Sequence, residues 1–240
     1  MRRTSQVILS YTFFFFANVL ATPDHTQHAC SQQFTIAGLI QPAWLHLDYQ
    51  QLNGRRTVYY YVNAHGNRLL LKTGNAPQNL LLHPKPIPAS FQHYIQQTTE
   101  RLSKAINLHF IRVYDKDKSD FTINASCTPD SRILGLSAGL EQHSNQINII
   151  LNFCEGNSLI IEKKMHSVFL HELGHVLGLE HPFDDSDGDC IFTTTAWSRQ
   201  SATKTDTQMA YRFQDQYYDW YRPHDLKTLT AIWGPAKTSN

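Results

Sequence analysis

The chain has 240 residues, of which 41% are hydrophobic and 12% aromatic, enough for a sizeable core in one or two domains. Its 21 lysines and arginines nearly balance its 20 aspartates and glutamates, for a formal net charge of +1. This balance gives no basis for nucleic acid or an anionic membrane as the main partner, and we expect neither.

The first 21 residues have the pattern of an export signal. Two arginines near the start are followed by an apolar run over residues 7–20, and small residues precede the end at Ala21. An uncleaved membrane anchor is the alternative, but the run is short for a bilayer span and contains three polar residues. We therefore predict cleavage after Ala21, a secreted or periplasmic mature protein, and no stable membrane insertion after cleavage.

Four cysteines agree with an oxidising compartment. They are Cys30, Cys127, Cys154 and Cys190, and no Cys-x-x-Cys pair suggests a zinc knuckle or a redox motif. Two disulfides are expected, and the four cysteines can be paired in three ways. We favour Cys127 with Cys154, because both end strand-like runs, which leaves Cys30 with Cys190.

Residues 22–88 form an N-terminal segment, which we interpret as the first strands of the main domain rather than as a short propeptide. Residues 57–62 are rich in valine and tyrosine, and residues 68–72 form a second apolar run. Loop chemistry over residues 63–67 favours a hairpin of these two strands. Residues 77–88, with several prolines, are predicted to be a loop.

Residues 89–240 form the predicted core of an α+β domain. Apolar residues at helical spacing predict a helix over residues 89–107. The remaining predicted elements are strands at 108–113, 121–125, 133–140 and 146–153, a buried helix at 162–178, and a closing helix at 223–234.

The chemistry is concentrated in residues 171–181. His171 and His175 lie one helical turn apart, so both side chains project from one face and can share a metal ion. Glu172 stands where a carboxylate reaches a metal-bound water without being a ligand. His181 can join only if the helix ends first, and Gly178 can adopt the left-handed conformation that ends a helix. Three histidines with one open position are typical of catalytic rather than structural zinc.

This stretch, His-Glu-x-x-His-x-x-Gly-x-x-His, resembles the zinc motif of the metzincin metallopeptidases. That family also has a turn containing a methionine beneath the zinc, and Met209 follows in the right order. A tyrosine two residues later ligates zinc or stabilises the reaction intermediate in two branches of the family, and Tyr211 holds that position. The match is nearest to serralysin-like and matrixin-like peptidases. The resemblance implies a mixed twisted sheet with two long helices, a zinc cleft, and a smaller C-terminal subdomain ending in a helix.

The resemblance implies a secreted zinc-dependent endopeptidase in which Glu172 is the general base for a zinc-activated water. Zinc, with Tyr211, would hold the oxyanion. The expected partner is a protein or peptide substrate, and we expect a monomer. One alternative is a catalytically inactive metzincin-fold protein that acts by binding or adhesion, although retention of Glu172 argues for an enzyme. A cell-wall or small-peptide hydrolase is a further alternative with the same chemistry.

Two further hypotheses concern residues near this motif. Asp184, Asp185, Asp187 and Asp189 form an acidic loop that is either a calcium site or a solvated loop, and its spacing fits an EF-hand poorly. Asp184 or Asp185 alternatively orients a ligand histidine. Cys30 could silence the zinc as matrixin propeptides do, but the Pro-Arg-Cys-Gly sequence of those propeptides is absent around it.

Overall fold

The computed structural model describes residues 29–43, 45, 51–67, 83–127, 134–139, 146–154, 159–213 and 217–237. The predicted export signal at 1–21 and the predicted strand at 68–72 lie outside these ranges. The elements are η1 (Ala37–Leu39), β1 (Thr57–Val62), β2 (His83–Lys85), α2 (Ala89–Ser103), β3 (His109–Val113), η2 (Lys116–Lys118), β4 (Phe121–Cys127), β5 (Gly135–Gly139), β6 (Ile147–Asn152), α3 (Leu159–Val176) and α4 (Pro223–Trp233).

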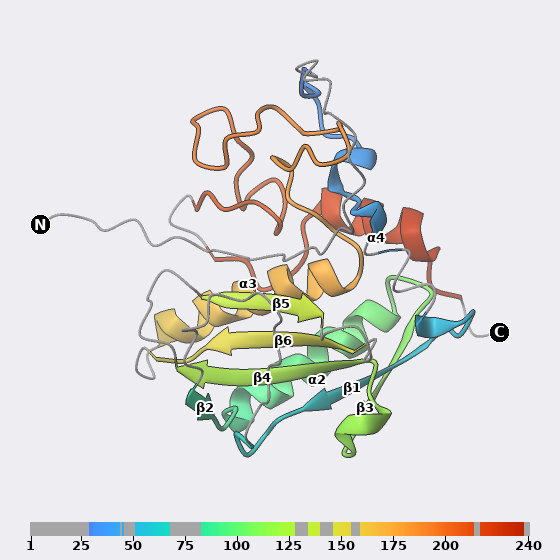
Figure 1. The fold of residues 1–240 in the computed structure, drawn as a ribbon, viewed down its shortest axis with the longest axis vertical. Coiled ribbons are helices and arrows are strands. Elements are labelled where there is room, and N and C mark those ends of the chain that lie inside the picture. The colour runs from blue at the N-terminus through green and yellow to red at the C-terminus, as the bar shows by residue number, and fades with distance from the viewer. Residues whose placement is uncertain are drawn as a thin grey trace, which may run out of the picture.

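The strands form one mixed sheet in the order β3-β1-β4-β6-β5, and β2 also pairs with β4. The four neighbouring strands β3, β1, β4 and β6 are parallel, whereas β5 runs antiparallel to β6 and β2 runs antiparallel to β4. In Figure 1, α2 passes behind the strands, and α3 lies beside β5. The predicted α+β class with a mixed sheet and two long helices is confirmed, and the domain boundaries stay a prediction.

The N-terminal part of the sheet differs from the prediction. Strand β1 has parallel neighbours on both sides, β3 and β4, so the antiparallel hairpin predicted for it is wrong. Residues 83–85 fall in the predicted loop but form β2, a three-residue strand paired with β4. A strand this short tolerates Pro84 because proline is accepted where one edge of a strand stays unpaired. Both errors arise because these pairings join segments that are distant in sequence.

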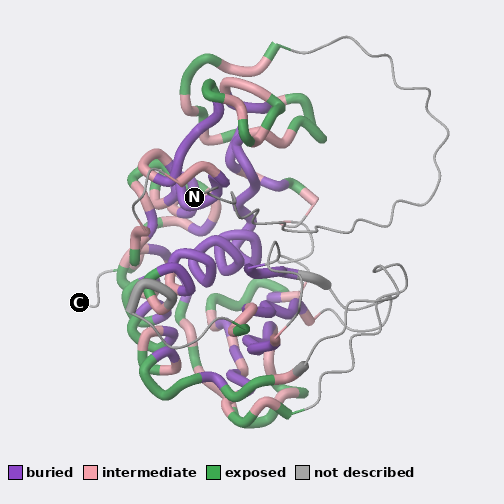
Figure 2. Tube along the Cα trace, turned by 90° about the vertical axis from the view of Figure 1, so that its left-hand side faces the viewer, coloured by how far each residue is buried: buried purple, intermediate pink, exposed green. Residues whose placement is uncertain are grey.

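The main core lies between the sheet and the two long helices. Fully buried apolar side chains come from β4, β6, α2 and α3, among them Phe91, Ile95, Ile123, Ile149, Leu151, Phe169 and Leu173. The continuous apolar run of β6 is buried over Ile147–Leu151, as its pattern predicted. Helix α3 is buried along most of its length and crosses the middle of the molecule in Figure 2. Burial on nearly all sides explains why its sequence is apolar on nearly all sides.

Between α3 and α4, the described residues have little regular secondary structure. Figure 1 shows this irregular region above the sheet, together with the first described residues of the chain. A disulfide between Cys30 and Cys190 joins these two segments, and a second disulfide between Cys127 and Cys154 joins the ends of β4 and β6. The favoured pairing is therefore confirmed. Among the described residues, no helix is long and apolar enough to cross a membrane.

Candidate metal centre

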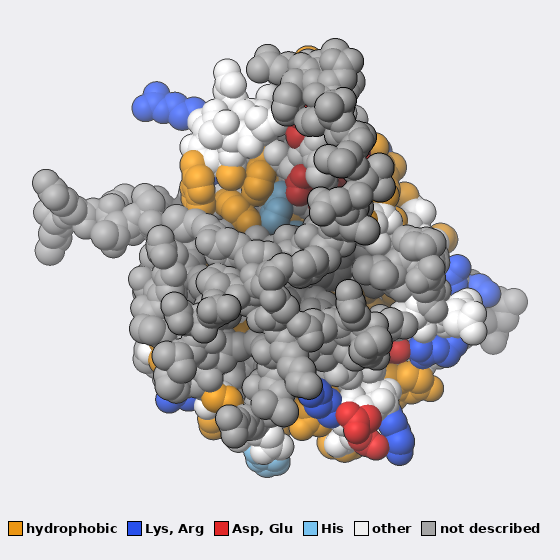
Figure 3. All heavy atoms as spheres, viewed as in Figure 1, with side chains coloured by type: hydrophobic (Ala, Val, Ile, Leu, Met, Phe, Trp, Pro, Cys, Tyr) orange, Lys and Arg blue, Asp and Glu red, His pale blue; other side chains and the backbone are white. Residues whose placement is uncertain are grey.

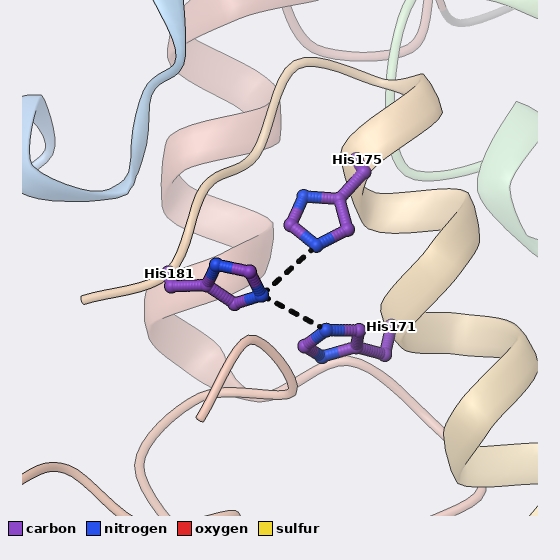
Figure 4. A group of neighbouring side chains, drawn as sticks. All are labelled: His171, His175 and His181. Atoms are coloured by element: carbon purple, nitrogen blue, oxygen red, sulfur yellow. Dashed lines mark hydrogen bonds between the residues drawn. The ribbon is translucent and has the colours of Figure 1, made fainter. Parts of the chain in front are cut away.

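Three histidine side chains meet at one point in the interior. The Nε2 atom of His181 lies 3.1 Å from Nε2 of His175 and 3.2 Å from Nε2 of His171. All three rings are buried. Figure 4 shows two of them reaching out from α3 and the third approaching from the chain that follows it. The predicted ligand set is thus brought together as a group that could hold a metal ion.

His181 reaches the other two because α3 ends in a sharp reversal at Gly178. The Leu179 N–H donates to the Gly174 carbonyl at 2.9 Å, and the Gly178 N–H donates to the His175 carbonyl at 3.0 Å. This pair of bonds is the Schellman motif, which needs a left-handed residue. Gly178 supplies it with φ of +91°. The predicted role of Gly178 in ending the helix is confirmed.

Hydrogen bonds to Nδ1 set the orientation of the two helical histidines. Nδ1 of His171 lies 2.8 Å from the Gln208 carbonyl, and Nδ1 of His175 lies 2.9 Å from the Leu179 carbonyl. A carbonyl only accepts, so each Nδ1 carries the proton and each Nε2 presents a lone pair to the shared point. A second interaction that fixes the tautomer in this way is typical of histidines that bind metals.

The electrostatics of the site keep the imidazoles neutral. Burial lowers the pKa of His175 to about 4, against the opposing effect of its bond to Leu179. Burial likewise lowers the pKa of His171 and His181 well below the usual value, and the neighbouring Lys204 and histidine rings lower it further. Neutral rings are the form that binds metals, since a protonated imidazole has no lone pair left.

The geometry fits a small tetrahedral ion. Zinc binds imidazole nitrogen at about 2.0–2.1 Å, so two nitrogens of a tetrahedral site are ~3.3 Å apart. The two separations measured at His181 are slightly shorter than this value. Three imidazoles suit zinc and also other transition metals, so the donor set could hold a metal ion without selecting which one.

Met209 packs against α3 at Gly174. Its side chain is fully buried, and a Cβ atom added at Gly174 would lie 2.6 Å from its sulfur. Gly174 sits between His171 and His175 on α3, so the absence of a side chain there lets the turn containing Met209 approach the helix. The role of Met209 as the methionine of a metzincin-type turn stays a prediction, and the need for glycine at 174 was not foreseen.

Tyr211 lies beside the histidines. Its ring centroid is 4.8 Å from that of His181 and 5.8 Å from that of His171. The ring also contacts Phe183, at 4.8 Å, and the exposed Trp197, at 5.7 Å. These contacts place Tyr211 at the site, and its role as a zinc ligand or oxyanion donor stays a prediction.

Figure 3 shows a histidine at the surface in the upper part of the molecule, between hydrophobic and acidic side chains.

Glu172 lies on the side of α3 that faces β5. Its carboxylate is buried and accepts a hydrogen bond of 2.9 Å from the Ser137 hydroxyl. A Cβ atom added at Gly135 would lie 2.8 Å from the other carboxylate oxygen. Two small residues of β5 thus shape the space around the predicted base. The sequence did not indicate that Gly135 and Ser137 approach Glu172, because both are distant from it along the chain.

A buried carboxylate holds the methionine turn. Asp225, near the start of α4, accepts hydrogen bonds from the Gln208 N–H at 2.9 Å, from the Arg222 N–H at 2.7 Å and from the Thr207 hydroxyl. Gln208 in turn accepts the bond from His171 through its carbonyl. The position of His171 therefore depends on α4, through Gln208 and Asp225. In the sequence, Asp225 was only one residue of the closing helix predicted at 223–234.

Lys204 is a buried lysine beside the three histidines. Its ammonium nitrogen donates to the same Gln208 carbonyl and lies 3.3 Å from Nδ1 of His171. Burial lowers its pKa to about 7, although Asp225 and Glu172 act in the opposite direction. A positive charge here disfavours protonation of the histidines. Lysine is common at protein surfaces, so the residue type alone did not predict a buried position for Lys204.

The acidic loop supplies only part of a second cluster. Carboxylate oxygens of Glu180, Asp187 and Asp189 lie within 4.8 Å of one another. Glu180 had not been foreseen as a member. Burial raises its pKa to about 10, and Asp187, Asp189 and Asp184 add to the increase. Burial also raises the pKa of Asp189 to about 7, with a contribution from its hydrogen bond to Asp187.

Comparison with known proteins leaves the family open. No family model matches the chain, and no curated protein matches it. Among solved structures, a similar chain occurs in the GM1 bound form of the ECX AB5 holotoxin. The identity is 12%, the TM-score is 0.45, and the match covers 77% of this chain and 82% of that one. A likeness at that level carries no argument about fold family or activity.

Proposed function

We propose that this chain is a zinc-dependent endopeptidase of the metzincin type. The observation that carries the proposal is the convergence of three buried imidazole nitrogens from His171, His175 and His181, with the buried carboxylate of Glu172 on the same helix. Met209, packed against α3 at Gly174, and Tyr211 beside the histidines support the metzincin assignment. The two disulfides agree with a protein that acts outside the cytosol.

The three histidines would hold the ion and leave a coordination position open for the substrate and water. A zinc ion held there supplies Lewis-acid chemistry and makes water acidic enough to react near neutral pH. Glu172 takes the proton from the attacking water and passes it to the leaving amine as the peptide bond breaks. The hydroxyl of Ser137 holds one oxygen of this carboxylate, which limits its rotation.

The proposed substrate is an extended peptide lying along β5. Among the described strands, β5 is the last of the sheet and pairs only with β6, so its other edge offers unpaired backbone groups. An extended chain can add to such an edge through main-chain hydrogen bonds. A peptide bound there would run past Glu172, which contacts Ser137 of the same strand. Trp197, exposed beside Tyr211, offers an apolar surface for a substrate side chain.

The test is cleavage of a mixed peptide library by purified protein starting at residue 22. Activity should disappear with a zinc chelator and return on addition of zinc. Glu172→Gln should keep one zinc per chain and the wild-type melting temperature, while kcat/KM falls by about 10²–10⁴-fold. Glu162→Gln makes the same change in the first turn of the same helix and should cleave normally.

Substantial activity in Glu172→Gln would remove that residue from the reaction. A folded wild-type protein with one zinc and no cleavage of any library peptide would favour the binding-protein alternative.

A further inference from the structure

A second group of metal-binding side chains lies apart from the histidines. It comprises Glu180, Asp187 and Asp189, whose carboxylate oxygens lie within 4.8 Å of one another. Glu180 is only 2% exposed, Asp189 is half-buried, and Asp187 is exposed at the outer side of the group. An acidic cluster at a surface is usually solvated, but this cluster extends into the interior through Glu180.

Two oxygens in this cluster have lost water without gaining a partner. One carboxylate oxygen of Glu180 accepts a hydrogen bond from the Gln41 side chain at 3.2 Å. The other, Oε1, is buried and has no hydrogen-bond partner among the described residues, and the same is true of Oδ1 of Asp189. A buried carboxylate oxygen without a partner is costly, and a bound cation removes that cost.

The cluster brings together carboxylates of one sign. Asp184 and Asp185 stand in the same acidic loop as Asp187 and Asp189. Among the described residues, no ion pair joins Glu180, Asp187 or Asp189 to a lysine or arginine. A bound cation would offset the repulsion between the three carboxylates.

From this arrangement we propose that Glu180, Asp187 and Asp189 bind a calcium ion. Calcium takes oxygen ligands at about 2.3–2.6 Å, so oxygens on opposite sides of its shell are up to about 4.6–5.2 Å apart, and the cluster fits within that span. Magnesium needs a tighter octahedron at about 2.0–2.1 Å, which an irregular loop with half-exposed carboxylates provides less well. Water and backbone carbonyls would complete the shell.

The proposed ion would fix the segment that carries His181. Glu180 directly precedes this histidine, and its N–H donates to the Leu39 carbonyl at 3.1 Å. Asp189 directly precedes Cys190, whose disulfide with Cys30 anchors the first described residues. Gly38 permits the close approach of the two segments, since a Cβ atom there would lie 2.5 Å from the Asp189 carbonyl. Calcium would thus join three segments next to the histidine group.

The test uses zinc-loaded, calcium-depleted protein starting at residue 22, titrated with calcium chloride. Wild-type protein should bind one calcium per chain by equilibrium dialysis, with a dissociation constant of about 10⁻⁵–10⁻³ M, and its melting temperature should rise by several degrees. Zinc content, measured in the same samples, should stay constant. Magnesium chloride at equal concentration should produce a smaller rise.

Glu180→Gln and Asp189→Asn should each weaken calcium binding at least tenfold and abolish the thermal shift. Asp185→Asn is the matched control: it removes one charge from the same loop at an exposed position outside the cluster, and it should respond like the wild type. If Glu180→Gln does not fold, Asp189→Asn still decides the question. Absence of calcium binding to the wild type, or equal binding by all four proteins, would overturn the proposal. Neither readout involves peptide cleavage, so the result is independent of the proposed activity.

Discussion

The three histidines come from two regions that are held together in different ways. His171 and His175 stand on α3, whose position is fixed by apolar packing against the sheet and α2. His181 stands in the irregular region, where a disulfide, backbone bridges and side-chain bonds replace regular structure. Apolar packing tolerates small adjustments, whereas each polar contact in the irregular region is specific to one donor and one acceptor. Single substitutions in the irregular region should therefore affect metal binding more than equally destabilising ones in the sheet.

The two disulfides provide the largest expected effect, because one belongs to each region. The Cys30–Cys190 bond closes a sequence separation of 160 residues, and the Cys127–Cys154 bond closes one of 27. Chain-entropy estimates give about 5 and about 3.6 kcal/mol for loops of these lengths. Replacing Cys30 and Cys190 by serine should thus lower the free energy of unfolding more, as measured by urea denaturation. It should also weaken zinc binding, whereas replacing the other pair should not. Equal loss of zinc affinity in both variants would contradict the distinction between the regions.

Asp225 tests the polar network of the irregular region. Its carboxylate accepts bonds from Thr207, Gln208 and Arg222, and it is fully buried. Asp225→Ala leaves three donors without their acceptor, two of them buried, so we expect a loss of about 2–4 kcal/mol in stability. Zinc affinity should fall as well, because the Gln208 carbonyl that orients His171 loses its support.

Urea denaturation and a competitive zinc titration measure the two effects. Asp219→Ala changes an exposed aspartate in the same segment and is the control. Unchanged zinc affinity in Asp225→Ala would show that the turn keeps its position without this residue.

Gly174 and Met209 test the contact between the regions. Gly174→Ala improves helix propensity, but its Cβ atom would lie 2.6 Å from the Met209 sulfur. The close contact should outweigh the propensity, with a net loss of about 1–3 kcal/mol in the free energy of unfolding. In a Met209→Ala background the same substitution should cost less, because the obstructing atom is gone. A double-mutant cycle measured by urea denaturation separates the two cases, and strict additivity would mean that the two residues do not interact.

His166 tests the packed region alone and should give the smallest effect. Its ring stacks on Tyr94 at a centroid distance of 3.5 Å, and burial lowers its pKa. When the folded pKa lies below the unfolded value of about 6.5, the unfolded chain binds more protons, so stability falls as pH decreases through that range. His166→Phe removes this contribution while keeping an aromatic ring. Metal-free His166→Phe should lose less stability than the wild type between pH 7 and pH 5, and an equal loss would assign the pH dependence to other groups.

The sequence predicted those features that are local along the chain. The sequence pattern identified α2, α3 and α4. The spacing of His171, His175 and His181 around Gly178 identified the group of three histidines that could hold a metal ion. The predicted boundaries were off by a few residues, as at α2, which ends at Ser103 rather than at residue 107. Helix ends depend on individual capping bonds that periodicity does not report.

Features that depend on distant pairing were not predicted. The sequence predicted a hairpin over residues 57–72, but β1 pairs in parallel with β3 and β4. Ser137 lies 35 residues before the glutamate it contacts, and Lys204 lies 33 residues after His171. Neither residue type is unusual at its position, so only the folded chain reveals the contact. The same holds for Glu180, which completes an acidic group from outside the acidic loop.

X-ray absorption at the zinc edge on purified protein, combined with metal quantification, tests the three-histidine site most directly. We expect one zinc per chain, with three imidazole nitrogens at about 2.0–2.1 Å and one oxygen ligand. His181→Ala should then show one imidazole fewer and a much weaker affinity. A wild-type protein that retains no metal after purification in zinc-containing buffer, or that binds zinc equally well without His181, would contradict the assignment of the three histidines.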